Sequence, residues 1–302
     1  MEITGNILAT IHQSTTNLSK LDKLSAPEPH KTNQICLVSP DSSLSLSSSK
    51  WKFTYGNGKG VNMTQKEQVI NCLKELGGYA TFSRLNSAIN FSTWKTKTPE
   101  ASIRRIVQDH PEFFRIQPGL WALVESKDDI LRKLKIEDNV DGLEQKNMDF
   151  SHSYYQGLVT EIGNYKGMCT YVPSQDKNKL FLETPLSEVA STTKIFEFTY
   201  ENIVKRAKTI DVIWFNERAL PHSFYEIEHS TDIQNSLSKF YELQDFAAKF
   251  YIIADEYRHE KYKEIINRSI YNAIKTRVNF VNYDSISKQH EIAFRAKETT
   301  VI

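Results

Sequence analysis

The feature that most constrains the fold is a pair of β-forming stretches in which acidic side chains stand among apolar ones. Residues 209–215 place Asp211 inside the run Ile-Asp-Val-Ile-Trp-Phe, and residues 223–228 end in Glu226-Ile-Glu228. Branched and aromatic residues favour strands, and so apolar a run predicts a strand that is largely buried. The chain must therefore hold ionisable groups on or beside a buried sheet.

The rest of the second half alternates between helical and strand patterns. Its apolar spacing predicts a mixed α/β order, because helices are interleaved among the strands. The expected helices cover residues 155–162, 233–248 and 262–266, and the further expected strands cover 168–172, 250–254 and 278–283.

The first half contains a different pattern. Thr64 and Glu67 form a capping box ahead of a helix that ends at Gly77, and Thr81 caps a second, short helix. Thr98, Pro99 and Glu100 are typical of the start of a third helix. Two β-rich runs, 113–116 and 120–123, then flank Pro118-Gly119, which suits the centre of a type II turn. Three helices followed by a hairpin predict a winged helix-turn-helix.

These patterns divide the 302 residues into four segments and give an α+β multidomain protein. We expect an irregular, Ser-rich arm over 1–63, the winged helix over 64–126, a charged linker over 127–150 and a mixed-sheet α/β core over 151–302.

Composition excludes several function classes. No run reaches the 18 or so apolar residues of a membrane span, and residues 1–11 lack the features of a signal peptide, so we expect a cytoplasmic protein without a membrane partner. The cysteines show no zinc-ligand spacing, and a net charge of +1 excludes a histone-like polycation.

The acidic residues carry the strongest chemical signal. Glu226 and Glu228 point to the same face of a strand, and if Asp211 lies on its neighbour, three carboxylates converge. Such a cluster is costly unless a cation compensates it, and carboxylate oxygens suit Mg²⁺, with Mn²⁺ as a substitute. The alternative is an edge strand with solvated carboxylates. We favour a metal site for phosphodiester hydrolysis.

The stretches 210–215 and 224–231 resemble the core of the PD-(D/E)xK, or restriction-endonuclease-like, nucleases. The resemblance implies that Asp211 and Glu226 are catalytic metal ligands, and that Glu228 stands where the usual pattern has Lys. Some Type II restriction enzymes of this fold carry Glu there. The role of the missing lysine, to orient the attacking water, could be taken by Lys208, Lys239 or Gln244, since these lie on nearby elements. Family members often add an acid from the preceding helix, and Glu161 is the candidate, although it could equally face water. His229 is interpreted as structural, and Asp255-Glu256 as a helix start.

The winged-helix region resembles the winged helices fused to restriction endonucleases and the related HARE-HTH group, on residues 98–106 and 113–123. Between Arg84 and Arg105 five basic residues face only Glu100, a net charge of +4. This excess predicts DNA contacts from the third helix and the loop before it. A protein-binding winged helix is the alternative. The predicted DNA-binding residues are Lys95, Lys97, Ser102, Arg104 and Arg105.

Together the two modules predict a Type II-like restriction endonuclease that hydrolyses double-stranded DNA at a specific sequence with Mg²⁺. Cutting both strands favours a homodimer. One alternative is a repair or methyl-directed nuclease of the same fold. Another is an inactive DNA-binding regulator, because the usual lysine is missing.

Overall fold

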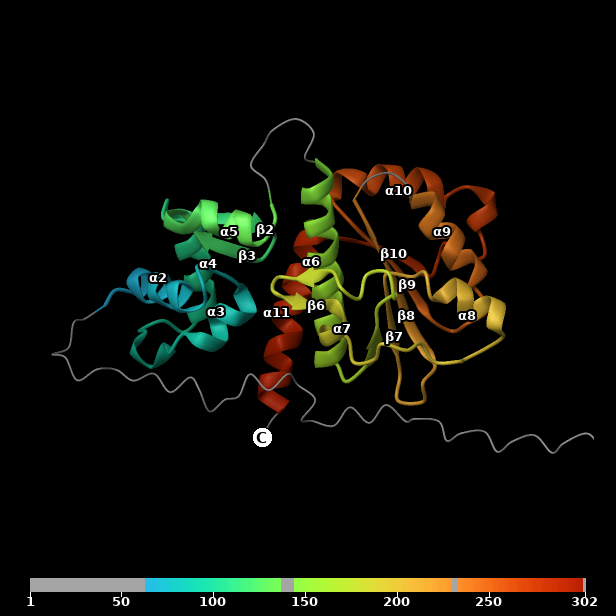
Figure 1. Ribbon diagram of the computed structural model, residues 1–302, viewed down its shortest axis with the longest axis horizontal. Coiled ribbons are helices and arrows are strands. Elements are labelled where there is room, and N and C mark those ends of the chain that lie inside the picture. The colour runs from blue at the N-terminus through green and yellow to red at the C-terminus, as the bar shows by residue number, and fades with distance from the viewer. Residues whose placement is uncertain (1–62, 137–143, 230–232, 301–302) are drawn as a thin grey trace, which may run out of the picture. The chain divides into compact units, whose positions relative to one another are not determined.

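The computed structural model describes residues 63–136, 144–229 and 233–300 (Figure 1). The predicted arm over 1–63 lies outside these residues except for its last position. None of the described helices is long and apolar enough to span a membrane.

The N-terminal domain has the order helix, strand, helix, helix, hairpin. Its helices are α2 (Gln65–Glu75), α3 (Phe82–Ala88) and α4 (Pro99–Asp109), and its sheet has the order β1-β3-β2, from β1 (Tyr79–Thr81), β2 (Phe113–Gln117) and β3 (Leu120–Leu123). The capping box of Thr64 and Glu67 is confirmed, and the Thr81 hydroxyl accepts from Arg84 N. Thr98 precedes α4 without a side-chain cap bond.

Two features of the β2–β3 turn require glycine at position 119. Gly119 has φ +79°, which residues with a side chain rarely adopt, as the predicted turn requires. A Cβ at this position would also lie 1.8 Å from Ser287 Oγ of α11 (Tyr283–Thr300). Glycine is therefore needed for both backbone conformation and close approach.

The structure differs from the predicted charged linker over 127–150. Residues in this stretch form α5 (Lys127–Lys133) and the first part of α6 (Glu144–Tyr165). Ile130 and Leu131 of α5 are buried while most of its charged side chains are exposed, and this helix corresponds to the helical stretch expected around Ile130, Leu131 and Leu134 within the charged segment.

The C-terminal domain is built on a five-stranded mixed sheet of order β10-β9-β8-β7-β4. β8 pairs in parallel with β9, which pairs in parallel with β10, whereas β7 is antiparallel to both β8 and β4. The strands are β4 (Cys169–Tyr171), β7 (Val212–Phe215), β8 (Pro221–Glu228), β9 (Lys249–Ala254) and β10 (Val278–Asn282).

Helices cover both faces of this sheet, because alternate residues of its central strands are apolar on each side. Tyr225 and Ile227 pack with α6 and α11, while Phe224 and Phe250 pack against the opposite helices. Figure 1 shows α6 and α11 on one side of the strands, and α8 (Glu201–Ala207), α9 (Ile233–Glu242) and α10 (His259–Ile266) on the other.

The expected helices and strands of this domain are all present, with shifted ends. Asp211 lies just before β7 and not within it. The sequence reading did not predict β1 or α8, a short hairpin of β5 (Leu180–Phe181) and β6 (Thr184–Pro185), the turn of helix α7 (Leu186–Val189), or the long α11.

The two domains share one hydrophobic cluster. Tyr79, Leu120 and Ala122 of the N-terminal domain belong to the same buried cluster as Tyr154 of α6 and Ile286 of α11. Hydrogen bonds cross the same contact, since Tyr154 donates to Pro118 O at 3.1 Å and Tyr155 to Gln117 Oε1 at 3.1 Å. The hairpin is thus packed onto the body that carries the acidic residues.

Candidate active site

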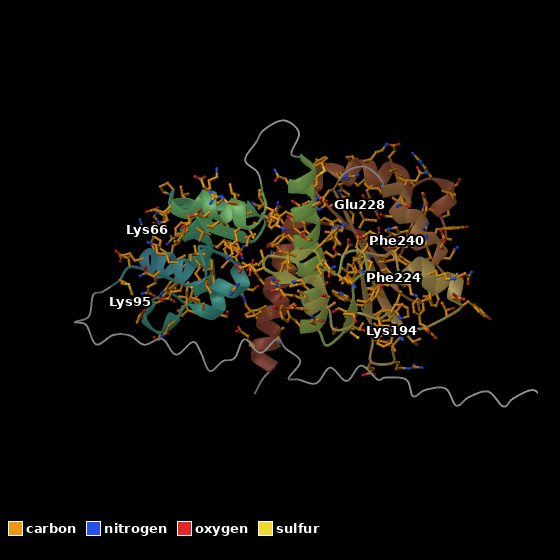
Figure 2. All side chains as sticks on the ribbon, viewed as in Figure 1. Lys66, Lys95, Lys194, Phe224, Glu228 and Phe240 are labelled. Carbon is orange, nitrogen blue, oxygen red and sulfur yellow. The ribbon has the colours of Figure 1, made fainter. Side chains whose placement is uncertain are left out.

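Three of the four predicted acids, Asp211, Glu226 and Glu228, meet at one edge of the five-stranded sheet, where β7 begins and β8 ends. Tyr225 pairs with Val212 in the antiparallel ladder. The next residue of β8, Glu226, is therefore level with Asp211, and Glu228 lies two residues further along β8. In Figure 2 Glu228 lies toward the upper edge of the sheet, and Phe224 lies further down the same strand. Antiparallel pairing therefore brings residues 15 and 17 positions apart into one site.

Asp211 is buried, with 9% of its surface exposed, and its carboxylate is held by two neighbours. Oδ2 accepts a hydrogen bond from Ile227 N at 2.7 Å and lies 3.3 Å from His152 Nε2. Burial raises the pKa of Asp211, but the hydrogen bond and charge of His152, the Ile227 N–H and the charge of Lys239 outweigh it, so the pKa lies below its usual value. Asp211 is an anion at neutral pH.

Glu226 is more deeply buried, at 3% exposure, and forms an ion pair with a helix of the opposite layer. Lys239 Nζ, from α9, lies 2.7 Å from Oε2 and 3.0 Å from Oε1. The same ammonium donates to Thr209 O at 3.0 Å. Burial and the charge of Asp211 raise the pKa of Glu226 to about 8, even though Lys239 opposes the shift. One cation does not fully compensate two buried carboxylates.

Glu228 shares a hydrogen-bond partner with Glu226. Ser236 Oγ of α9 lies 3.0 Å from Glu226 Oε2 and also contacts Glu228 Oε1. Burial raises the pKa of Glu228, against the effect of Ser236 and of the nearby Arg258. A hydroxyl has a single proton to donate, so this arrangement is best satisfied when one of the two carboxyls is itself protonated.

Glu161, the predicted ligand from the preceding helix, is not brought to this group. Its Oε2 accepts a 2.6 Å hydrogen bond from His290 Nε2 of α11. Glu161 also raises the pKa of Tyr165, after the larger effect of burial. The side chains of α6 that reach Asp211 lie earlier in the helix.

Those side chains are His152 and Gln156, which the sequence reading did not single out. Gln156 Nε2 donates to Asp211 O at 2.7 Å and to Asp176 Oδ2 at 3.1 Å. Burial lowers the pKa of His152, but the hydrogen bond and charge of Asp211 together have a larger effect. The pKa of His152 therefore lies above its usual value. The spacing of four residues puts both on one helix face, which was the available signal. His152 was missed because the expected helix began only at residue 155, whereas α6 begins at Glu144.

The three residues proposed to take the role of the missing lysine lie in different surroundings. Lys239 points into the acid group, whereas Lys208 is exposed at the end of α8 and Gln244 is only half-buried in the turn after α9. His229 contacts Tyr283 OH through Nδ1 at 2.7 Å, and burial lowers its pKa to about 3. It is a neutral, packed side chain. Asp255 caps the short turn Glu256–Arg258, as expected of a helix start.

The predicted DNA-binding residues divide into two groups. Lys95, Lys97 and Arg105 are exposed, and Ser102 is half-buried with its hydroxyl donating to Thr98 O. Arg104, in contrast, lies over the Phe82 ring and forms a 2.7 Å ion pair with Glu291 of α11. Arg104 therefore joins the two domains in this structure, and the outward basic surface of α4 is provided by Arg105.

The donor set fits a hard divalent cation. Asp211 and Glu226 offer carboxylate oxygens only, and Mg²⁺ commonly takes one or two protein carboxylates and completes its shell with water and substrate phosphate. Over the three described ranges, no group of three or more His, Cys, Asp or Glu side chains is arranged to hold a metal ion. Asp211 and Glu226 are the residues that would hold such an ion.

The C-terminal half of the chain is similar to known proteins. The family model for the C-terminal domain of the type II restriction enzyme NmeDI matches residues 134–301, which include the five-stranded sheet and every acid described above. Type II restriction enzyme NmeDI of Neisseria meningitidis serogroup C is 23% identical over 159 residues, covering 49% of this chain and 44% of that protein. The match thus spans less than half of the relative. No solved structure matches the chain.

The protein is therefore restriction-enzyme-like, on the evidence of the segment that holds its buried acids. Because the family model covers more than half of its residues, the chain belongs to the family of the NmeDI C-terminal domain.

Proposed function

We propose that this protein is a Type II-like restriction endonuclease that hydrolyses phosphodiester bonds of double-stranded DNA, with a PD-(D/E)xK site formed by Asp211, Glu226 and Lys239. The supporting observation is the buried group itself: two carboxylates at the edge of the sheet with an ammonium 2.7 Å from one of them. The similarity to a named restriction enzyme over the same residues supports the same function.

In this proposal Asp211 and Glu226 hold Mg²⁺, or Mn²⁺ in its place. The ion would polarise the phosphate and lower the pKa of a water molecule. Asp211 is fixed for this purpose by Ile227 N and by His152, so its carboxylate needs little rearrangement. The motif has a lysine where this chain has Glu228 on β8. Lys239 of α9 supplies that positive charge instead and orients the attacking water.

Glu228 has a different role from the lysine whose place it takes. It contacts Ser236, which also contacts Glu226, so a proton can be shared along Glu226, Ser236 and Glu228. We propose that this group stores the proton which Glu226 loses when a cation arrives.

The N-terminal domain is proposed to be a winged helix that reads DNA through α4 and the basic loop before it. Arg105, Lys95 and Lys97 provide the exposed charge. A homodimer, with one site for each strand, would account for cutting both strands.

The test is a digestion of plasmid and genomic DNA by the wild-type protein and by Asp211→Asn and Glu226→Gln, each with Mg²⁺ or Mn²⁺, with fragment ends mapped by sequencing. We expect discrete cut sites for the wild type and none for either variant, while both variants still bind DNA. If the folded wild-type protein left all DNA intact with either ion, an inactive DNA-binding regulator would be the better account.

A further inference from the structure

A cavity of about 460 Å³ opens beside the acid group, at the same edge of the sheet. It is lined by the residues that follow three parallel strands: His229 after β8, Asp255 to Tyr257 after β9, and Asn282 and Tyr283 at the end of β10. In open α/β sheets the carboxyl ends of parallel strands are where ligands bind. Arg115 and Gln117 of the N-terminal hairpin also line it.

The cavity lies near the acids but is not lined by them. His229 follows Glu228 in the chain, and Tyr283 OH bonds Glu228 O at 3.1 Å and His229 Nδ1 at 2.7 Å. The Glu228 backbone thus borders the cavity, while the Glu228 side chain contacts Ser236 of α9.

One wall of the cavity is rigid and aromatic. The Tyr283 ring stacks on Tyr155 with centroids 3.8 Å apart and planes 8° from parallel, and Tyr155 OH donates to Gln117 Oε1. Gln117 Nε2 donates in turn to Ser151 Oγ at 2.7 Å. Tyr257 also lines the cavity and is 75% exposed, a high fraction for a large aromatic side chain. An exposed ring beside a fixed one suits a flat ligand.

The net negative charge of the lining disfavours a phosphate and favours a hydrogen-bond donor. Three carboxylates, those of Asp255, Glu256 and Asp284, face a single guanidinium, Arg115, whose Nη2 is 2.9 Å from Asp284 Oδ1. A phosphate would be repelled by the excess of negative charge. An amino group on an aromatic ring would instead donate to carboxylate oxygens, as the N4 group of cytosine does to Asp or Glu.

We propose that this cavity binds a single unstacked nucleobase with an amino group at the position of cytosine N4 or adenine N6, from the strand that is bound at the acid site. The inference extends the proposed function, since such a base would belong to the strand at the acid site. Extrusion of a base from duplex DNA has a moderate free-energy cost, which stacking on tyrosine and hydrogen bonds to the base edge offset.

The test uses free nucleosides, so that it depends neither on cleavage nor on the target sequence. Saturation-transfer NMR on the full chain would measure binding of cytidine against uridine and of adenosine against inosine, pairs that differ in an amino group replaced by a carbonyl. We expect dissociation constants of about 1 mM for cytidine or adenosine and at least fivefold weaker binding of its carbonyl partner.

Variants locate the binding. Tyr257→Ala should weaken binding at least fivefold, whereas Tyr200→Ala, which removes a ring that is 82% exposed at the start of α8, should leave it unchanged. Asp211→Asn should also leave nucleoside binding unchanged while it abolishes cleavage. Equal binding of all four nucleosides, no binding, or indifference to Tyr257→Ala would overturn the proposal. Binding without DNA cleavage by the wild type would overturn the nuclease and leave the base site standing.

Discussion

Lys239 Nζ lies 2.7 Å from Glu226 Oε2, although the two residues belong to a helix and a strand on different layers and are 13 positions apart. Lys239 of α9 thus brings to Glu226 the positive charge that a lysine at position 228 would provide in the usual motif. This pair is therefore the contact on which the proposed activity depends most directly.

Lys239→Met should reduce cleavage about 100- to 1,000-fold, because one electrostatic contact at the reacting group is lost. Lys239→Arg should retain part of the activity, since it keeps the charge. The matched control is Lys208→Met, an exposed lysine near the end of α8. Single-turnover cleavage rates at saturating protein give the comparison. Equal rates for the Lys208 and Lys239 variants would remove Lys239 from the mechanism.

The free energy of unfolding of the metal-free protein should fall between pH 6.5 and pH 8. The pKa of Glu226 is raised to about 8 from 4.5, so the folded state holds a proton that the unfolded state has released, and rising pH removes that advantage. The lowered pKa of His229 acts in the opposite direction only below pH 6.5.

Glu226→Gln isolates this contribution, because it keeps the shape and removes the titration. We expect melting temperatures of wild type and variant to diverge as pH rises through this window, with the wild type falling. Added Mg²⁺ should restore the wild type alone. Parallel curves would show that Glu226 does not titrate there.

Glu228→Lys, which gives the commoner motif, should slow cleavage. The new ammonium would stand near Lys239 and Arg258, so like charges would repel, and Ser236 would lose an acceptor. Glu228→Gln serves as the uncharged control. A Glu228→Lys protein faster than wild type at ordinary Mg²⁺ concentration would refute a separate role for Glu228.

Arg104 and Arg105 should have opposite effects although they are adjacent. Arg104→Ala leaves the buried Glu291 without its 2.7 Å partner and should lower the melting temperature by about 2–4 °C for each kcal/mol lost. Arg105→Ala should leave stability unchanged and weaken DNA binding by about 1–3 kcal/mol if it reads a base, or lower the salt dependence by about one unit if it contacts phosphate. Paired thermal melts and binding titrations separate the two. The reverse pattern would return Arg104 to the DNA interface.

Gly119→Ala should destabilise the protein more than Gly167→Ala. Both glycines have positive φ, +79° and +72°, so each alanine pays about 1–2 kcal/mol in backbone strain. A Cβ at position 119 would also collide with Ser287, whereas no atom of the described residues lies within 4 Å of a Cβ at position 167. Chemical denaturation of both variants, and of Gly119→Ala with Ser287→Ala, measures the difference. Equal losses at 119 and 167 would mean that the hairpin does not press on α11.

Much of the local structure could be predicted because its causes are local. Caps such as Thr64 and Thr81, the turn at Gly119 and the alternation of Glu226 and Glu228 are readable within a few residues. The meeting of Asp211 and Glu226 was also within reach, since short antiparallel strands place neighbours in sequence opposite each other.

What the sequence could not reveal depends on tertiary contacts. Lys239 is one of many lysines, and nothing local distinguishes it from Lys208; only the packing of α9 on β8 turns it toward Glu226. His152 was missed and Glu161 preferred because the rotation of α6 about its axis is fixed by α11 and the sheet, neither of which its own residues specify. Arg104 was assigned to DNA because its partner, Glu291, lies 187 positions away.

The hydrophobic cluster shared by the two domains limits how this protein could acquire a new target. Tyr79, Leu120 and Ala122 cover apolar side chains of α6 and α11, so a fragment beginning after residue 126 would leave that surface bare. If the N-terminal domain alone were exchanged, its new surface would not fit the apolar side chains of α6 and α11. A successful chimera would have to carry the facing residues of α11, Ser287 and Glu291 among them, along with the domain.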